Sequence, residues 1–375
     1  MRIAIVCYPT FGGSGVVATE LGMALAHKGH DVHFVTYKQP VRLQLLHKNI
    51  HFHEVHVPTY PLFKFQPYEL ALSSKLVNTI LKNKIELVHV HYAIPHAYAA
   101  YMAKQMLLEH GVKIPIVTTL HGTDITLVGS HPFYKPAANF SINASDVVTA
   151  VSKSLQEDTL THFEVKNEIR VIPNFIDFSL YKDDYTDCER DVMANENEKI
   201  ITHVSNMRPV KRLTDVIDTY YQIQLKIPSV LLLVGDGDDR EKAYHRARYL
   251  GIQEKVKFLG KTNEVDKILC FSDLFLLPSE KESFGLAALE AMANKTPVIA
   301  SNTGGLPEVV QHGYNGYMAD VGDVEAMSQW AIQLLGNEEK LQKFKMQAFE
   351  TAKKFDLTHI LPMYETAYQD ALSKI

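Results

Sequence analysis

Short apolar runs alternate with amphipathic segments along the whole chain of 375 residues. The runs are rich in Val and Ile and almost continuously hydrophobic, which is typical of strands buried on both faces of a parallel sheet. In the first half they lie at Ile3–Cys7, Val32–Tyr37, Leu87–His91, Ile114–Leu120 and Val147–Val151. In the second half they lie at Ile200–Val204, Val230–Val234, Val256–Leu259, Leu274–Leu277 and Val298–Ala300. The alternation predicts an α/β fold with doubly wound parallel sheets.

The length of the chain favours two domains, because single hydrophobic cores rarely grow to this size. We expect one Rossmann-like domain at residues 1–173 and a second at residues 174–356, with the break near Pro173–Asp177. The last segment, 357–375, is expected to pack back on the first domain. Facing α/β domains of this kind bind ligands at the carboxyl ends of their strands, so the site is expected there.

Composition and charge exclude several classes of protein. A net charge of -5 argues against a general nucleic-acid-binding or anionic-membrane surface. The N-terminal apolar run ends at Tyr8–Pro9, which is too early for a signal peptide or a membrane span. Cys7, Cys188 and Cys270 form no CxxC pair, so neither a disulfide framework nor a structural zinc site is expected. We therefore expect a cytoplasmic protein without stable membrane insertion, and a homo-oligomer stays open.

A glycine-rich segment, Gly12–Gly15, follows the first apolar run. Read from Gly13, its spacing is Gly-x-Gly-x-x-Ala, which matches the dinucleotide-binding fingerprint. That fingerprint also expects an acidic residue at the end of the second strand, where Val35–Gln39 carries no carboxylate. NAD and NADP are therefore disfavoured. A turn that only packs helix on strand remains an alternative, and we favour a loop that cradles the phosphate of another ligand.

The segment Glu282–Glu290, with the sequence ESFGLAALE, leads from an apolar run into residues of high helix propensity. The start of a helix presents free backbone N–H groups and the positive end of the helix dipole, which suit a phosphate. Carboxylates beside it suit the hydroxyl groups of a sugar. The segment therefore predicts a nucleotide-sugar site.

Two cations, Arg208 and Lys211, follow the first apolar run of the second half. Arg offers forked donors to phosphate oxygens, whereas Lys acts as a point charge. The alternative is a solvated basic turn before the helix that begins near Leu213. Together with the glycine segment and ESFGLAALE, the pair favours a clamp for a diphosphate.

Glu282 and Glu290 also suggest the carboxylate pair of a glycoside hydrolase. A retaining hydrolase needs its carboxylates about 5–5.5 Å apart. A largely helical segment of this length would separate them by up to roughly 12 Å. The wider, inverting arrangement stays open if the loop folds back, but we favour separate roles for the two glutamates.

Histidines supply further candidates. His121 closes an apolar run and is followed by glycine, so we expect it at the carboxyl end of a strand near a ligand. His51, His53 and His56 fall mostly on alternating strand positions, as do His89 and His91. Metal ligation would need converging partners that the sequence does not identify, so no metal is expected.

These motifs together resemble the retaining GT-B glycosyltransferases of family 4. The resemblance is carried by Glu282–Glu290, by the Arg208 and Lys211 pair, by Gly304–Val309 and by Gly12–Gly15. It implies a GT-B fold with two Rossmann-like domains, a nucleotide-diphosphate sugar as donor, and transfer without metal or cofactor.

A closer resemblance lies in Cys7–Thr10, His89–His96 and Thr118–Asp124. These segments are similar to the branch of the family that transfers N-acetylglucosamine from UDP-N-acetylglucosamine to L-malate, the first step of bacillithiol biosynthesis. Other assignments remain open: a GT-B transferase with a different acceptor, a UDP-sugar epimerase, or a sugar-binding module without activity.

The resemblance also implies site residues. Glu290 would hold the ribose, Glu282 the sugar hydroxyls, and His121 would contact the sugar. The expected catalytic residues are Lys211, Arg208, His121 and Glu282. The expected donor-binding residues are Gly13, Ser14, Gly15, Asn206, Arg208, Lys211, Glu282, Phe284, Gly285, Leu286 and Glu290. The expected acceptor-binding residues are Ser14, Tyr92, Thr119, Asn206 and Arg208.

Overall fold

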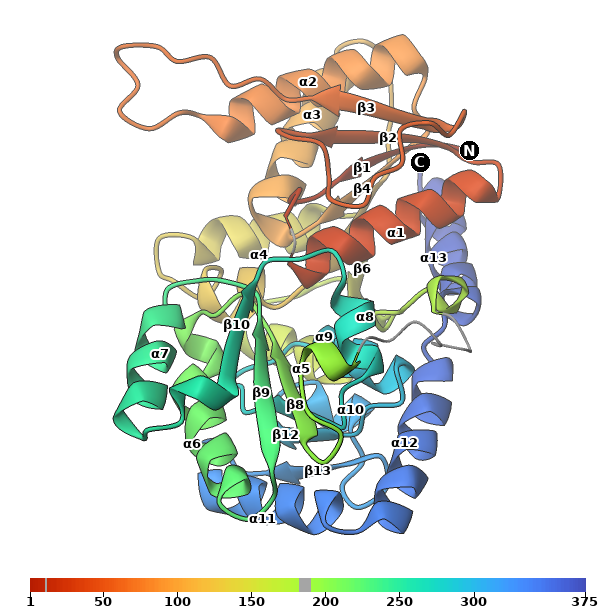
Figure 1. The fold of residues 1–375 in the computed structure, drawn as a ribbon. Helices are drawn as coiled ribbons and strands as arrows, with labels where there is room; N and C mark the ends of the chain where they lie inside the picture. The colour runs from red at the N-terminus through yellow and green to blue at the C-terminus, as the bar shows by residue number, and fades with distance from the viewer. Residues whose placement is uncertain (11, 182–189) are drawn as a thin grey trace. The chain divides into compact units, whose positions relative to one another are not determined.

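A computed structural model describes residues 1–10, 12–181 and 190–375. The chain forms two compact units, each described here by itself (Figure 1). Unit 1 comprises Met1–Phe175 and Leu357–Ile375, and unit 2 comprises Ile176–Asp356. The C-terminal segment therefore folds with the N-terminal half of the chain.

Unit 1 is built on a seven-stranded sheet with the order β3-β2-β1-β4-β5-β6-β7, in which every pairing is parallel. Its strands are β1 (Arg2–Val6), β2 (Asp31–Thr36), β3 (Ile50–Glu54), β4 (Leu87–His91), β5 (Ile116–Leu120), β6 (Val147–Ala150) and β7 (Ile169–Val171). Its helices are α1 (Gly13–His27), α2 (Tyr68–Asn83), α3 (Tyr98–Leu108), α4 (Lys135–Ala144), α5 (Lys153–His162) and α13 (Leu357–Leu372).

Unit 2 carries a six-stranded parallel sheet with the order β10-β9-β8-β11-β12-β13. Its strands are β8 (Lys199–Val204), β9 (Ser229–Val234), β10 (Val256–Gly260), β11 (Leu274–Leu277), β12 (Val298–Ser301) and β13 (Gly316–Ala319). Its helices are α6 (Leu213–Gln224), α7 (Arg240–Tyr249), α8 (Val265–Cys270), α9 (Leu286–Ala293), α10 (Leu306–Val309), α11 (Val324–Leu335) and α12 (Glu338–Lys353).

Successive residues of the central strands face two separate cores, which explains why the apolar runs are nearly continuous. In unit 2, Ile201 and Leu231 lie in one hydrophobic cluster, whereas Ile200 and Val230 lie in another. Side chains alternate between the two faces of a strand, so a sheet covered on both faces needs apolar residues at every position. The prediction of two doubly wound parallel sheets in two Rossmann-like domains is confirmed.

The cysteines differ from expectation in one respect. Cys7 is a free thiol in the core of unit 1. Cys270, the last residue of α8, is disulfide-bonded, and Cys188 lies outside the described residues. One bond is not the disulfide framework that the sequence disfavoured, and the cysteine spacing gave no sign of it.

Candidate functional site in each unit

The glycine segment of unit 1 forms the start of a helix. Helix α1 begins at Gly13, three residues earlier than the sequence suggested, so Gly13, Ser14 and Gly15 make its first turn. A Cβ atom at Gly15 would lie 2.5 Å from the carbonyl oxygen of Tyr8 and 2.6 Å from that of Thr10. Glycine is thus required for the helix start to lie this close to the preceding chain. The N-terminus of α1 follows β1 and favours anionic groups.

Ser14 and Tyr92 are in direct contact, although 78 residues separate them in the chain. The Ser14 Oγ and the Tyr92 hydroxyl are 2.7 Å apart. Tyr92 directly follows β4 and has a φ of 89°, which is unusual for a residue other than glycine. Its backbone N–H donates to the Thr119 carbonyl at 2.9 Å. Two predicted acceptor-binding residues therefore meet at the carboxyl ends of neighbouring strands.

Buried histidines lie beneath this contact. His121 Nε2 is hydrogen-bonded to His91 Nδ1 at 2.8 Å, and His96 Nδ1 donates to the His91 carbonyl at 2.6 Å. His89 Nδ1 is 2.8 Å from the hydroxyl of Tyr368 on α13. Burial lowers the pKa of His89 and of His121 to about 3 and that of His96 to about 4, and it lowers the pKa of His91 well below its usual value. At neutral pH the rings are therefore uncharged.

Thr119 is placed differently from the other predicted residues. Its side chain is fully buried, and its Oγ1 lies 2.8 Å from both His89 Nε2 and Thr149 Oγ1. The hydroxyl is thus engaged inside unit 1 and supports the ring of His89. We therefore leave Thr119 out of the proposed acceptor site.

Asp124 is an organising residue to which the sequence reasoning gave no role. It lies in the core of unit 1, and its carboxylate accepts backbone N–H groups from Ala93 at 2.8 Å, His121 at 3.1 Å and Gly122 at 2.9 Å. These bonds join the segments that follow β4 and β5. Burial raises the pKa of Asp124 to about 6, despite the three donors. An Asp three residues after His121, in a His-Gly-Thr-Asp turn, was the available signal.

In unit 2, Lys211 and Glu282 form an ion pair. The Lys211 Nζ lies 2.5 Å from Glu282 Oε1, and the hydroxyl of Ser279 donates to the same oxygen at 2.9 Å. Both charged side chains are mostly buried, with exposed fractions of 17% and 13%. The pair joins the turn after β8 to the turn after β11, and these strands are neighbours in the sheet. It holds the ammonium group in place at the carboxyl ends of the strands.

Arg208 lies next to this pair. In the amide orientation that satisfies both groups, the Asn206 carbonyl oxygen accepts from Arg208 Nε at 3.0 Å. The backbone N–H of Lys211 donates to the Arg208 carbonyl at 2.8 Å, so a tight turn carries both cations. The prediction that these residues lie at a strand end thus agrees with the structure.

The segment Glu282–Glu290 is fixed by close backbone packing. Gly304 has a φ of 54°, and a Cβ there would lie 1.9 Å from the Glu282 carbonyl oxygen. The N–H of Gly305 donates to that same oxygen at 2.9 Å. Only glycine allows this approach, which positions Glu282. Beyond it, the sequence-predicted helix is observed as α9, with Gly285 as N-cap, Leu286 as first residue and Glu290 in its second turn.

The aromatic ring of the segment, that of Phe284, points into the interior of unit 2. Phe284 is buried and packs edge-on against Phe355, with ring centroids 5.5 Å apart. Its side chain is therefore part of the packed interior of unit 2.

Two groups of residues thus lie at strand ends. We call Ser14, Tyr92, His91 and His121 the neutral cluster of unit 1. We call Asn206, Arg208, Lys211, Ser279 and Glu282 the charged cluster of unit 2.

Comparisons with known proteins agree with this arrangement. The model named Glycosyltransferase Family 4 matches residues 11–180, and the model named Glycosyl transferases group 1 matches residues 186–351. N-acetyl-alpha-D-glucosaminyl L-malate synthase of Bacillus anthracis is 46% identical over 374 residues, which cover 99% of this chain and 97% of the relative. The chain belongs to glycosyltransferase family 4. The prediction of a GT-B glycosyltransferase is confirmed, and the protein is an enzyme.

More distant matches to this glycosyltransferase come from both sequences and solved structures. D-inositol 3-phosphate glycosyltransferase of Corynebacterium glutamicum is 23% identical and covers 96% of this chain and 92% of its own. The structure of HepE from Anabaena, in complex with UDP and glucose, superimposes with a TM-score of 0.83 at 21% identity, covering 98% of this chain and 99% of that one. Sucrose-phosphate synthase from Thermosynechococcus elongatus gives a TM-score of 0.82 at 20% identity and full coverage of both chains.

Within residues 1–10, 12–181 and 190–375, no helix combines the length and the apolar character needed to cross a membrane.

Proposed function

We propose that this glycosyltransferase moves N-acetylglucosamine from UDP-N-acetylglucosamine to the hydroxyl group of L-malate, with retention at the anomeric carbon. The observation that carries the proposal is the 46% identity, over 99% of the chain, to an enzyme named for this product. That alignment covers nearly the whole chain, including the motifs at the carboxyl ends of β1, β4 and β5 that resemble this branch of the family.

The charged cluster of unit 2 is assigned to the donor. Arg208 and Lys211 stabilise the negative charge that develops on UDP as it leaves, while Glu282 binds sugar hydroxyls and Glu290 the ribose. The backbone N–H groups of Phe284, Gly285 and Leu286 at the start of α9 suit phosphate oxygens. The ion pair supports this assignment, because it fixes Lys211 before substrate arrives.

The neutral cluster of unit 1 is assigned to the reacting sugar and to the acceptor. Ser14 and Tyr92 offer hydroxyl groups, and the first turn of α1 suits a carboxylate of malate. Asn206 and Arg208 are also proposed to contact the acceptor. Gly13 and Gly15 are proposed to contact the diphosphate of the donor. His121 is uncharged, so it offers a hydrogen bond to the sugar and no positive charge.

The proposed reaction needs no nucleophile from the protein. The malate hydroxyl oxygen bonds to the anomeric carbon on the face from which UDP departs. The bond from that carbon to the phosphate oxygen breaks, and the proton of the hydroxyl passes to the departing diphosphate.

The test is incubation of the full chain with UDP-N-acetylglucosamine and a panel of acids, with UDP release and product mass as readouts. L-malate should give release and a product that carries N-acetylglucosamine, with the α configuration by NMR. Succinate is the matched control, since it has both carboxylates but no hydroxyl group, and it should give neither.

Each of the other possible outcomes would indicate a different function for the protein. Isomerisation of the donor without acceptor would identify an epimerase, and transfer to another hydroxy acid only would identify a different transferase. Donor binding without turnover would identify a binding module. Any of these results would overturn the proposal.

A cytoplasmic location belongs to the same proposal. The N-terminal apolar run that sequence reasoning assigned to a strand is β1, which pairs with β2 and β4 inside the sheet of unit 1.

A further inference from the structure

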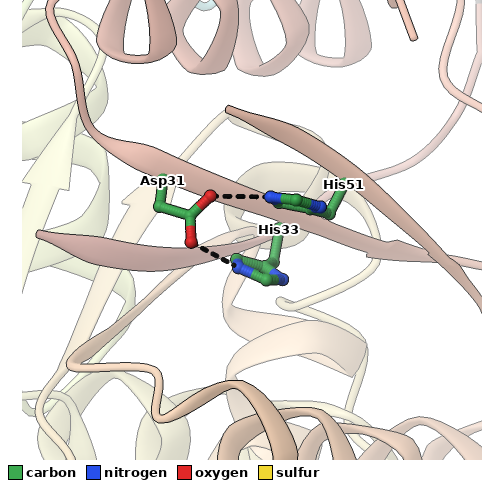
Figure 2. A group of neighbouring side chains, drawn as sticks. All are labelled: Asp31, His33 and His51. Atoms are coloured by element: carbon green, nitrogen blue, oxygen red, sulfur yellow. Dashed lines mark hydrogen bonds and ion pairs between the residues drawn. The ribbon is translucent and has the colours of Figure 1, made fainter. Parts of the chain in front are cut away.

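A second group of polar side chains lies at the opposite ends of the strands of unit 1. Asp31 is the first residue of β2, His33 follows it on the same strand, and His51 lies on β3 (Figure 2). The parallel register pairs His33 with His51. Because side chains alternate along a strand, all three lie on one face of the sheet.

The three side chains converge on one point. His51 Nε2 lies 2.7 Å from Asp31 Oδ1, and His33 Nε2 lies 3.3 Å from Asp31 Oδ2, as Figure 2 shows. The two imidazole rings are stacked, with centroids 4.4 Å apart. One ligand atom from each residue can be chosen so that all lie within 4.8 Å of one another. Asp31 is thus the converging partner that the sequence alone did not identify.

We propose that Asp31, His33 and His51 bind a zinc ion, or a divalent transition metal of similar chemistry, that links the edge strand β3 to β2. Two imidazole nitrogens and one carboxylate oxygen suit Zn²⁺, whereas Mg²⁺ and Ca²⁺ prefer oxygen ligands throughout. A tetrahedral zinc ion with bonds of about 2.0–2.1 Å holds its ligand atoms roughly 3.3 Å apart.

Rotation of the side chains would bring the three ligand atoms, which can now be chosen within 4.8 Å of one another, to that arrangement. The distance from His33 to Asp31 already fits, at 3.3 Å. The distance from His51 to Asp31 must widen, and both side chains can rotate, since they are 41% and 39% exposed. Their exposure also leaves room for water as the fourth ligand, as in zinc sites with three protein ligands.

His53 supplies the orienting contact that metal-binding histidines usually have. Its Nε2 lies 2.8 Å from His33 Nδ1, and the planes of the two rings are nearly parallel, at 12°. When His33 donates through Nδ1, its Nε2 presents a lone pair to the Asp31 carboxylate, and a cation between them removes the repulsion.

Nearby cations do not occupy the site. Arg2 lies close enough to act on His33, but its side chain pairs with Glu86 at 3.4 Å. Lys75 and Lys82 act on His53, which is not a ligand. The site lies at the amino ends of the strands, whereas the neutral cluster lies at their carboxyl ends, so the metal takes no part in glycosyl transfer.

The test uses the full chain, freed of any histidine tag and stripped with a chelator, titrated with ZnCl₂ in a calorimeter. We expect one ion per chain, and no binding of Mg²⁺ at the same concentrations. His51→Ala, which changes a half-exposed ligand, should weaken zinc binding by about tenfold or more, by comparison with the loss of an orienting contact. His56→Ala changes an exposed histidine outside the group and should leave binding unchanged.

Two further readouts separate a built site from chance binding. Zinc should slow hydrogen exchange of the β3 amides in the unmodified chain but not in His51→Ala, and glycosyl transfer should be equal in both. Zinc affinity that is the same in His51→Ala would mean an adventitious ion only. That result, or the absence of zinc binding, would overturn the proposal.

Discussion

The carboxyl ends of the strands carry different chemistry in the two units. In unit 1 they present hydroxyl groups and uncharged imidazoles, represented by Tyr92 and His121. In unit 2 they present a guanidinium group and a mostly buried ion pair of Lys211 with Glu282. The same kind of parallel sheet thus supports a neutral cluster in one unit and a charged cluster in the other.

The difference follows from what holds each cluster together. The neutral cluster depends on burial, which removes charge from its histidines, and on Asp124, which gathers three backbone donors. The charged cluster keeps its charges because they are paired, and close glycine packing at Gly304 fixes the loop that carries Glu282. A leaving diphosphate calls for fixed cations, and a sugar and an alcohol call for neutral hydrogen-bonding groups. The contrast therefore matches the proposed division of labour.

A drop in pH should give the largest difference between the two units, because it should destabilise unit 1 more than unit 2. The pKa values of His89, His96 and His121 lie at about 3, 4 and 3, well below the value of an unfolded histidine. The unfolded chain thus binds protons more readily below pH 6.5, and stability falls as the pH drops from there toward the folded pKa. Between pH 7 and pH 5 each histidine costs about 2 kcal/mol.

Asp124 acts in the opposite direction. Its pKa is raised to about 6, so its protonation below that value stabilises the folded state. This offsets about 1.4 kcal/mol at pH 5, which leaves a net loss on the order of 4 kcal/mol from Asp124 and these three histidines together. In the described part of unit 2, His203 is the sole histidine whose pKa is lowered, to about 4, and it costs about 2 kcal/mol.

Hydrogen exchange at both pH values, corrected for intrinsic rates, measures this difference in the full chain. Amides of β4 and β5 should lose more protection than those of β9 and β12. His110→Gln changes an exposed histidine of unit 1 and should leave the difference unaltered. Equal losses in the two units would show that burial does not keep these histidines neutral.

Lys211→Ala should break the charged cluster. By analogy with the loss of one preorganised donor, transition-state stabilisation should fall by about 2–4 kcal/mol, or roughly 30- to 1000-fold in kcat/KM. Lys267→Ala, on α8 of the same unit, changes an exposed lysine and should stay near the parent activity. Steady-state kinetics measures kcat/KM for both variants, and circular dichroism checks that each is folded. A loss below about threefold would contradict the proposed role of Lys211.

The sequence predicted the strands that lie inside the sheets better than those at the edges. The central strands are apolar at nearly every position, because both faces are covered. Strands β7 (Ile169–Val171) and β13 (Gly316–Ala319) were not predicted, and β3 was suggested only by its alternating histidines. All three lie at edges of their sheets. Edge strands pair on one side only, and these are short or polar, so periodicity gives them a weak signal.

The site could be predicted as a set of strand ends, but its contacts could not. Lys211 was placed as a diphosphate cation, yet its ion pair with Glu282 spans 71 positions of sequence. Thr119 was placed at a strand end as an acceptor contact, but the inward direction of its side chain follows from strand parity and from the position of His89. Such pairings depend on packing between strands that local sequence does not encode.

The smallest expected effect tests whether Ser14 and Tyr92 act as one unit in the neutral cluster. Tyr92→Phe removes the shared hydrogen bond, whose net value of about 0.5–1.5 kcal/mol corresponds to a roughly 2- to 10-fold rise in KM for malate. Tyr98→Phe, an exposed tyrosine of α3, is the matched control and should leave KM unchanged. If Tyr92 acts only by holding the Ser14 hydroxyl, adding Tyr92→Phe to Ser14→Ala should cost nothing further. Additive losses would instead mean that each hydroxyl contacts the acceptor by itself, and no change in either variant would remove both from the acceptor site.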